Sequence, residues 1–370
     1  FSTQQLSPDY ITAFQQHNPD TIQPIGLKHI NLKEASEKLS STTPTEGTPS
    51  HTELNENREQ LRTAAFAHLH NHTQFSVLQS TASIAALVKK TAAERMPAVA
   101  LTDSGNMMAA FHFVKEVAAY NEAAKAKNAE SEEQGNPPTE MIIKPIVGCE
   151  FNICDNHLDK SRQDNGYQVV ILAKNKHGYH NLAKMASIAS TEGFYYVPRI
   201  DKKVVEQYKD DLIVLSGGMN GEVPSKLLNI GQKQAEEALL WWKQQFAEDF
   251  YIELMRHGQE DENRANTALI ELSKKHGVKL IATNNTFYLE QKDANAHDIL
   301  LCVKDGEKQT TPIGRGRGHR FGMPNQEYYY KSAEAMKALF TDVPDAILNI
   351  QEIIDKVEVY TLEREILLPK

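Results

Sequence analysis

From residue 65 onward, short apolar runs alternate with longer stretches whose apolar residues recur every three or four positions. Short apolar runs are typical of buried strands, and the longer spacing is typical of amphipathic helices. The runs predict strands at residues 65–69, 98–102, 142–153, 168–173, 212–215, 250–255 and 279–282. The spacing predicts helices at residues 83–95, 107–127, 178–190, 234–246 and 262–276. Strands that alternate with helices predict βα units and a parallel sheet.

The pattern is weaker in residues 1–60, which we interpret as a partly disordered connector. They predict two short helices, at 9–16 and 33–39, separated by the breaker Pro24-Ile25-Gly26. Residues 40–60 are rich in Ser, Thr, Pro and Glu and have almost nothing to bury, so they predict a flexible linker.

The body of the chain is expected at 61–300, followed by a basic loop and a helical tail at 301–370. After Asp293 the sequence predicts helices at 294–303, 333–340 and 344–357, and a glycine-rich loop at 314–322. Within the body, a charged insert at 122–140 is expected to extend a helix and then loop out into solvent.

Composition fits an ordinary globular chain of 370 residues, with 40% hydrophobic and 24% charged positions. No apolar run approaches the roughly 20 residues that span a bilayer, so no membrane contact is expected. Cys149, Cys154 and Cys302 have no zinc-knuckle spacing, which favours buried thiols in a reducing cytoplasm. Phe1 is not a natural start, so a fragment is expected. The net charge of −9 argues against a broad DNA-binding surface.

The chemistry concentrates in residues 66–80, FAHLHNHTQFSVLQS. His68, His70 and His72 are two residues apart, so on a regular strand all three imidazoles point to one side. That pattern indicates one wall of a metal site.

The stretch HLHNHTQFSVLQS resembles the first motif of the PHP (polymerase and histidinol phosphatase) domain, in the form found in the alpha subunit of bacterial DNA polymerase III. The stretches MPAVALTDSGNM, KPIVGCEF, LIVLSGG and LIATNNTFY follow in the family's order, so the resemblance covers roughly 65–370. It implies a distorted (β/α)7 TIM-like barrel, an α/β fold. The preceding IQPIGLKHINLK resembles the connector that follows a fused proofreading exonuclease in some alpha subunits.

In active PHP domains nine His, Asp, Glu or Cys side chains hold a cluster of divalent metals. By the resemblance, three of these positions keep a ligand here, namely His70, His72 and Glu150. The other six are replaced, and they are occupied by Gln79, Ser104, Gln168, Gly218, Asn285 and Phe287. Clustered cations need carboxylates to offset their mutual repulsion, and only Glu150 remains at these positions. The sequence therefore predicts a degenerate site without a multinuclear centre.

A single ion is a separate question, because His70, His72 and Glu150 form a His2Glu set that suits zinc with an open fourth position. The alternative is that the three are hydrogen-bonded barrel residues. At most one weakly bound Zn²⁺ is expected, and hydrolysis of phosphodiesters is not. His68 is expected to be structural, and Asp103 to cap the following helix.

The loop around Arg315, Arg317 and Arg320 is the one concentrated positive element. Its arginines could contact DNA phosphates or dock onto neighbouring domains.

Three functions compete. The first is a structural and interaction module of a replicative polymerase, with the palm and thumb domains, DNA and a fused or associated proofreading exonuclease as partners. The parent protein would then be a bacterial, cytoplasmic DNA-directed DNA polymerase (a nucleotidyltransferase) that uses Mg²⁺. The second is a metal-dependent 3′–5′ exonuclease or phosphoesterase, and the third is a histidinol-phosphate phosphatase. The lost ligands favour the first, in which the fragment itself lacks catalytic activity.

Overall fold

The computed structural model describes residues 49–314 and 316–363. The chain divides into two compact units, Phe1–Ser50 and His51–Lys370, and every element below belongs to the second unit. The predicted helices at 9–16 and 33–39, and the connector-like IQPIGLKHINLK, lie outside the described residues. Within the part that is described, no helix is both long and apolar enough to cross a membrane.

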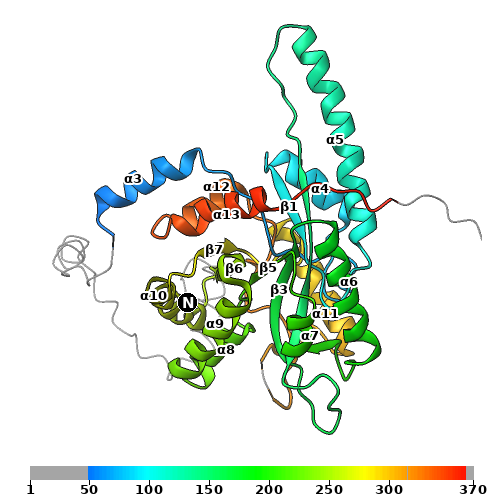
Figure 1. Cartoon of the computed structure of the whole chain (residues 1–370), viewed down its shortest axis with the longest axis vertical. Coiled ribbons are helices and arrows are strands. Elements are labelled where there is room, and N and C mark those ends of the chain that lie inside the picture. Colours follow the sequence, from blue (N-terminus) through cyan, green and yellow to red (C-terminus); the bar gives the residue numbers. More distant parts are fainter. Residues whose placement is uncertain (1–48, 315, 364–370) are drawn as a thin grey trace, which may run out of the picture. The chain divides into compact units, whose positions relative to one another are not determined.

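Seven strands form one sheet at the centre of the second unit (Figure 1). They are β1 (Ala98–Leu101), β2 (Lys144–Cys154), β3 (Tyr167–Ala173), β4 (Arg199–Asp201), β5 (Leu212–Leu215), β6 (Phe250–Met255) and β7 (Leu280–Thr283). Hydrogen-bonded neighbours follow the order β1-β2-β3-β5-β6-β7, and β4 pairs with β2 off this path. Six of these strands coincide with predicted runs, whereas the three-residue β4 was not predicted.

The sheet is mixed, so the prediction of a parallel sheet is wrong for one strand. β3 runs antiparallel to both β2 and β5, while the other pairs are parallel. The physical reason is the connection between β2 and β3: residues 155–166 contain no helix. Without a crossover, the chain can only turn back beside the strand it has left.

The predicted strand at 65–69 is an extended segment that closes the sheet into a barrel. On one side the carbonyls of His68 and Asn71 accept hydrogen bonds from Ala100 N and Thr102 N, both at 3.0 Å. On the other side Thr286, just beyond β7, donates its N–H to His70 O (3.0 Å) and accepts from His72 N (2.8 Å). The segment therefore bridges the two sheet edges, which confirms the distorted TIM-like α/β fold.

Helices surround the strands (Figure 1). They are α3 (His51–Arg62), α4 (Ile84–Ala93), α5 (Ala110–Glu133), α6 (Lys176–Thr191), α7 (Lys202–Gln207), α8 (Glu222–Asn229), α9 (Gln232–Phe246), α10 (Glu260–His276), α11 (Ala294–Asp305), α12 (Ala333–Leu339) and α13 (Asp345–Lys356), with 3-10 turns η1 (Ala247–Asp249) and η2 (Gln291–Asp293). Local chemistry sets several ends: the side chain of Ser83 caps α4, Asn175 caps α6, and Gly277 ends α10 in the left-handed conformation.

The linker prediction for residues 40–60 is wrong over its last ten residues, which form most of α3. This helix buries Leu61, and its Asn57 donates a hydrogen bond to Thr341 O at 2.9 Å. The helices α12 and α13 share one hydrophobic core with the strands, through Met336 and Ile350 among others. The tail therefore packs on the barrel.

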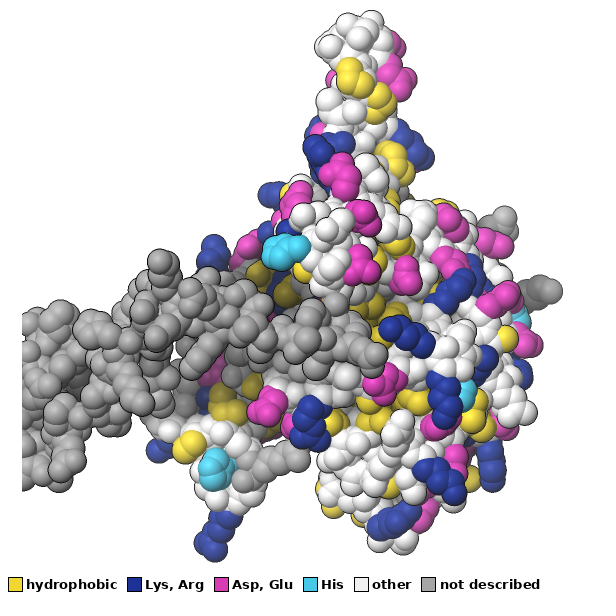
Figure 2. Space-filling model, turned by 90° about the vertical axis from the view of Figure 1, so that its left-hand side faces the viewer, with side chains coloured by type: hydrophobic (Ala, Val, Ile, Leu, Met, Phe, Trp, Pro, Cys, Tyr) yellow, Lys and Arg dark blue, Asp and Glu magenta, His cyan; other side chains and the backbone are white. Residues whose placement is uncertain are grey.

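The charged insert forms an arm that projects from the body (Figure 1). The helix α5 runs outward, and residues 136–143 return beside it. Asn121 binds both the N–H and the carbonyl of Ile143, and Asn128 binds both backbone groups of Glu140 in the same way, at 2.7–3.0 Å. Side chains of both charge signs are interspersed along the arm (Figure 2).

Candidate metal centre

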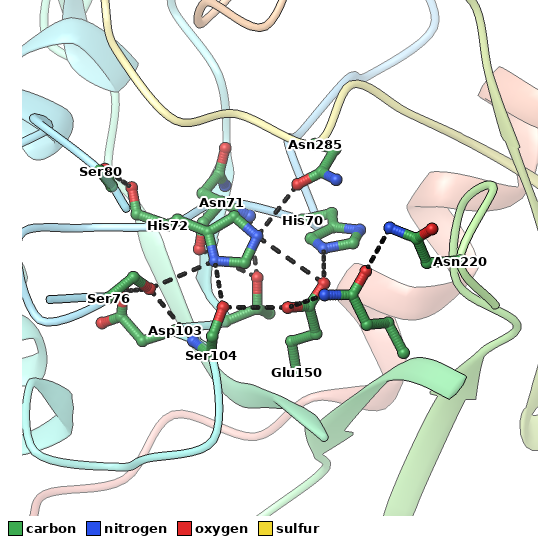
Figure 3. Close-up of polar contacts among 12 residues, drawn as sticks. His70, Asn71, His72, Ser76, Ser80, Asp103, Ser104, Glu150, Asn220 and Asn285 are labelled. Carbon is green, nitrogen blue, oxygen red and sulfur yellow. Dashed lines mark hydrogen bonds and ion pairs between the residues drawn. The ribbon is translucent and has the colours of Figure 1, made fainter. Parts of the chain in front are cut away.

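His70 lies between two buried carboxylates at the mouth of the barrel. Its Nε2 is 3.1 Å from Glu150 Oε2 (Figure 3). Its Nδ1 is 2.8 Å from Glu253 Oε1. Burial opposes protonation of this imidazole, but the two carboxylates together outweigh burial and raise the pKa of His70 to about 10. At neutral pH His70 is therefore an imidazolium that donates to both carboxylates.

His72 is also buried, and its surroundings combine neutral side chains with one carboxylate, since its Nε2 lies 3.9 Å from Glu150 Oε2. Its Nε2 is 3.0 Å from Asn285 Oδ1, and its Nδ1 is 3.2 Å from the hydroxyls of Ser76 and Ser104 (Figure 3). Its ring stacks on Phe287 at 4.3 Å between centroids. Burial is the largest influence and lowers the pKa of His72. The charges of Glu150 and Asp103 act in the opposite direction on this imidazole.

Glu150 accepts hydrogen bonds from the substituted positions around it. Ser104 Oγ donates at 2.9 Å and Gln168 Nε2 at 3.3 Å, and Asn220 Nδ2 in turn donates to Gln168 Oε1 at 3.0 Å. Burial favours the neutral acid, but His72, His70 and the Ser104 hydroxyl lower the pKa of this carboxyl below its usual range. Glu150 is thus a buried carboxylate held within a hydrogen-bond network.

The remaining substituted positions leave no ligand behind. The side chain of Gln79 makes no hydrogen bond to a described residue, and its carbonyl accepts from His297 Nε2 at 2.7 Å. At Gly218, a Cβ atom would lie 2.6 Å from the sulfur of Met255, so the methionine fills the space of any side chain there. Asn285 and Phe287 both contact His72 instead of presenting ligand atoms.

His68 and Asp103 hold the backbone around the centre. His68 Nε2 is 2.8 Å from Lys331 O, and burial lowers the pKa of His68 to about 4, in keeping with a structural role. Asp103 accepts from Thr73 N (2.6 Å), Thr73 Oγ1 (2.8 Å) and Ser76 Oγ (2.7 Å). The expectation that Asp103 caps the following helix is wrong, because its carboxylate fixes the loop after the histidine segment.

Glu253 was missed by sequence reasoning, although it contacts His70 directly. Besides His70, its Oε1 accepts a hydrogen bond from Thr283 Oγ1. A signal was available, since Glu253 is the single charged residue in the fully buried strand β6. A charge in such a strand needs a partner.

His70, His72 and Glu150 form a group that could hold a metal ion, since one ligand atom from each lies within 4.8 Å of the others. The six substituted positions offer amides, a hydroxyl, a glycine and an aromatic ring. Other carboxylates lie nearby, since Glu253 contacts His70 and Asp261 and Glu262 line the adjoining cavity.

Two backbone hydrogen bonds connect the ends of the basic loop, and its arginines have different environments. Gly314 N donates to Arg320 O at 3.0 Å, and Arg320 N donates to Pro312 O at 2.9 Å. The guanidinium of Arg320 binds both oxygens of Asp298, at 2.7 and 2.8 Å, and the residue is 5% exposed. The Arg320 guanidinium is therefore engaged inside the fold, and its contact with DNA or with a neighbouring domain stays a prediction. Arg317 is exposed, and Arg315 lies outside the described residues.

Comparisons with known proteins agree with the geometry. The PHP domain family matches residues 68–257, about half of the chain. DNA polymerase III subunit alpha of Borreliella burgdorferi is 37% identical over 297 residues, which cover 79% of this chain and 24% of the relative. The Campylobacter jejuni protein of the same name is 36% identical over 303 residues, covering 79% and 23%. The chain thus spans about a quarter of the length of these relatives.

Among solved structures, an amidohydrolase from Chromobacterium violaceum is 11% identical, with a TM-score of 0.33 over 60% of this chain and 87% of that chain. A likeness this low has no bearing on function.

The segment that matches the PHP family begins at His68 and ends at His257, so it contains His70, His72 and Glu150 together with their partner Glu253. From this match, and from the barrel closed by the histidine segment, we conclude that the chain belongs to the PHP domain family.

Proposed function

We propose that this chain is the PHP portion of a DNA polymerase III alpha subunit, and that it acts there as a structural and interaction scaffold rather than as a phosphoesterase. Two relatives at 36–37% identity carry that name, and the PHP family match supports the same assignment. In this proposal the parent chain is a bacterial, cytoplasmic DNA-directed DNA polymerase that uses Mg²⁺. Its palm and thumb domains, DNA and a proofreading exonuclease would be the partners.

The observation that carries the scaffold role is the engagement of both His70 nitrogens by carboxylates. A metal ligand needs a free lone pair, and here both nitrogens lie within hydrogen-bond distance of a carboxylate oxygen, Nδ1 of Glu253 and Nε2 of Glu150. Met255 packs where a ligand at position 218 would project. The centre is thus satisfied by hydrogen bonds, as expected for a buried polar cluster that stabilises a fold.

A single Zn²⁺ remains the alternative occupant in this proposal. It would use His70 Nε2, His72 and Glu150, and Glu253 would orient His70 through Nδ1, as carboxylates commonly do for metal-bound histidines. Binding would require the release of the His70 Nε2 proton and of its hydrogen bond to Glu150. We therefore expect weak binding that is readily reversed by a chelator.

The experiment measures metal content and nuclease activity on one sample. The purified chain is loaded with Zn²⁺ or Mn²⁺ and dialysed, its metal is quantified, and degradation of single-stranded DNA is followed. Less than one ion per chain and no degradation are expected. Two or three retained ions, with cleavage abolished in His70→Ala, would instead establish the exonuclease alternative.

The scaffold role has a separate test in the complete polymerase. Leu172 is fully buried in β3, so Leu172→Asp places a charge in the core and should unfold the domain. We expect polymerase activity to fall with it. Full polymerase activity in a chain with a demonstrably unfolded PHP domain would reject the scaffold role.

A further inference from the structure

A cavity of about 430 Å³ adjoins the hydrogen-bond network. Five side chains line it with carboxamides, and these are Gln79, Gln168, Asn220, Gln259 and Asn285. They reach the cavity from five separate segments of the chain, and Figure 3 labels Asn220 and Asn285 among them. Gln259 Nε2 donates to the hydroxyl of Tyr328 at 2.6 Å. The replacements have therefore changed the chemistry of the cavity without filling it.

Several of these amide atoms remain available. The whole amide of Gln79 is unpaired within the described residues. Asn285 uses its Oδ1 towards His72, which leaves Nδ2 as a donor, and Asn220 uses its Nδ2 towards Gln168, which leaves Oδ1 as an acceptor. The cavity wall thus includes donors and acceptors that carry no formal charge.

Apolar side chains form the rest of the wall. Met219 and Met323 line the cavity together with Phe321, whose side chain is 54% exposed. Methionine adapts its shape to a neighbour and makes favourable contacts with aromatic rings. A flat, apolar-faced ligand with polar edges fits such a wall.

The charges around the cavity disfavour a phosphate. Glu150, Asp261 and Glu262 line it, and Lys304 is the cationic side chain at its rim besides the enclosed His70. The Lys304 ammonium is also directed over the Phe321 ring, 5.1 Å from its centroid. An uncharged ligand avoids repulsion from these carboxylates.

We propose that this cavity binds an uncharged nucleobase or nucleoside, with adenine as the preferred base. Carboxamides of Asn and Gln pair with the N6 and N7 edge of adenine through one donor and one acceptor, as the unpaired Gln79 amide can. Met219, Met323 and Phe321 would contact the faces of the ring. This inference goes beyond the scaffold role and does not depend on it.

The test is calorimetric titration of the purified chain in EDTA with adenosine, inorganic phosphate and ribose as separate probes. Adenosine should bind saturably with a Kd of about 1 mM, while phosphate and ribose should not. Gln79→Ala should weaken adenosine binding about fivefold to tenfold, because it removes paired hydrogen bonds. Asn220→Ala provides a second variant at an exposed position, where loss of folding is not expected.

The matched control is Gln74→Ala, in the same loop as Gln79 but exposed and outside the cavity lining, and it should bind adenosine as the unchanged chain does. The proposal is overturned if adenosine does not saturate, or if ribose or phosphate binds at least as tightly. Equal affinity in the unchanged chain, Gln79→Ala and Asn220→Ala would overturn it too.

Discussion

Two substitutions of Glu253 measure the contribution of its charge separately from the contribution of its hydrogen bonds. Glu253 is 1% exposed, and its Oε1 accepts from both His70 Nδ1 and Thr283 Oγ1. Glu253→Ala removes both bonds and leaves the His70 imidazolium with one carboxylate. A hydrogen bond to a charged group contributes roughly 1.5–3 kcal/mol and a neutral one roughly 0.5–1.5 kcal/mol. We therefore expect Glu253→Ala to lower the free energy of unfolding by about 3 kcal/mol.

Glu253→Gln keeps an acceptor oxygen for both donors and removes only the charge. Its other carboxylate oxygen, Oε2, makes no hydrogen bond within the described residues, so an amide NH2 in that place breaks none. The expected loss is the difference between a charged and a neutral hydrogen bond, about 1 kcal/mol. The two variants should thus differ from each other by about 2 kcal/mol.

The assay is urea unfolding at pH 7 in EDTA, followed by circular dichroism and by the fluorescence of Trp241 and Trp242. Glu271→Ala is the control, since Glu271 is exposed on α10 and should change the free energy by less than about 0.5 kcal/mol. Equal losses for Glu253→Gln and Glu253→Ala would refute the assignment of separate charge and hydrogen-bond contributions. A Glu253→Ala variant as stable as the control would refute the buried network itself.

Three further predictions concern regions away from the centre. Burial opposes ionisation of Glu222, but its two lysine partners lower the pKa of this carboxyl. The stability that the carboxylate contributes is therefore present above the ordinary pKa of 4.5 and is lost as the pH falls through the lowered pKa. The difference in unfolding free energy between the unchanged chain and Glu222→Gln should decrease between pH 5 and pH 2. Arg320→Lys cannot make both hydrogen bonds to the Asp298 carboxylate, so it should lower the free energy of unfolding by about 2 kcal/mol. Faster proteolysis of the basic loop would be the measured result. Asn128→Ala should increase the rate of amide hydrogen exchange in residues 136–143 while the urea midpoint stays unchanged. An unaltered exchange rate there would contradict the role of Asn128 in holding the returning chain against α5.

Sequence reasoning located the long periodic elements well. The strand predicted at 250–255 is β6, and the helix predicted at 262–276 begins two residues earlier in α10. It missed α8, whose eight residues include Pro224, and it missed the direction of β3. Apolar spacing reports which residues are buried, but strand direction depends on how the connecting chain crosses the sheet.

The candidate centre was predictable where it follows the family motifs and not beyond them. His70, His72 and Glu150 do meet, although 80 residues separate His70 from Glu150. Glu253 is 183 residues from His70, and no local pattern links them. The same limit applies to Arg320, since its loop composition suggested an exposed cation and only the packing against Asp298 reveals an internal pair.

The paired asparagines of the arm imply a rule for how its length can vary. Asn121 and Asn128 are seven residues apart on α5, while their partners Ile143 and Glu140 are three apart on the returning chain. Seven helical residues advance about 10.5 Å and three extended residues about 10 Å, so the helix and the returning chain cover nearly the same length between the two asparagines. An insertion of seven residues in the helix and three in the return would preserve this match. The arm can therefore change its reach in fixed steps while the barrel that carries the histidines stays as it is.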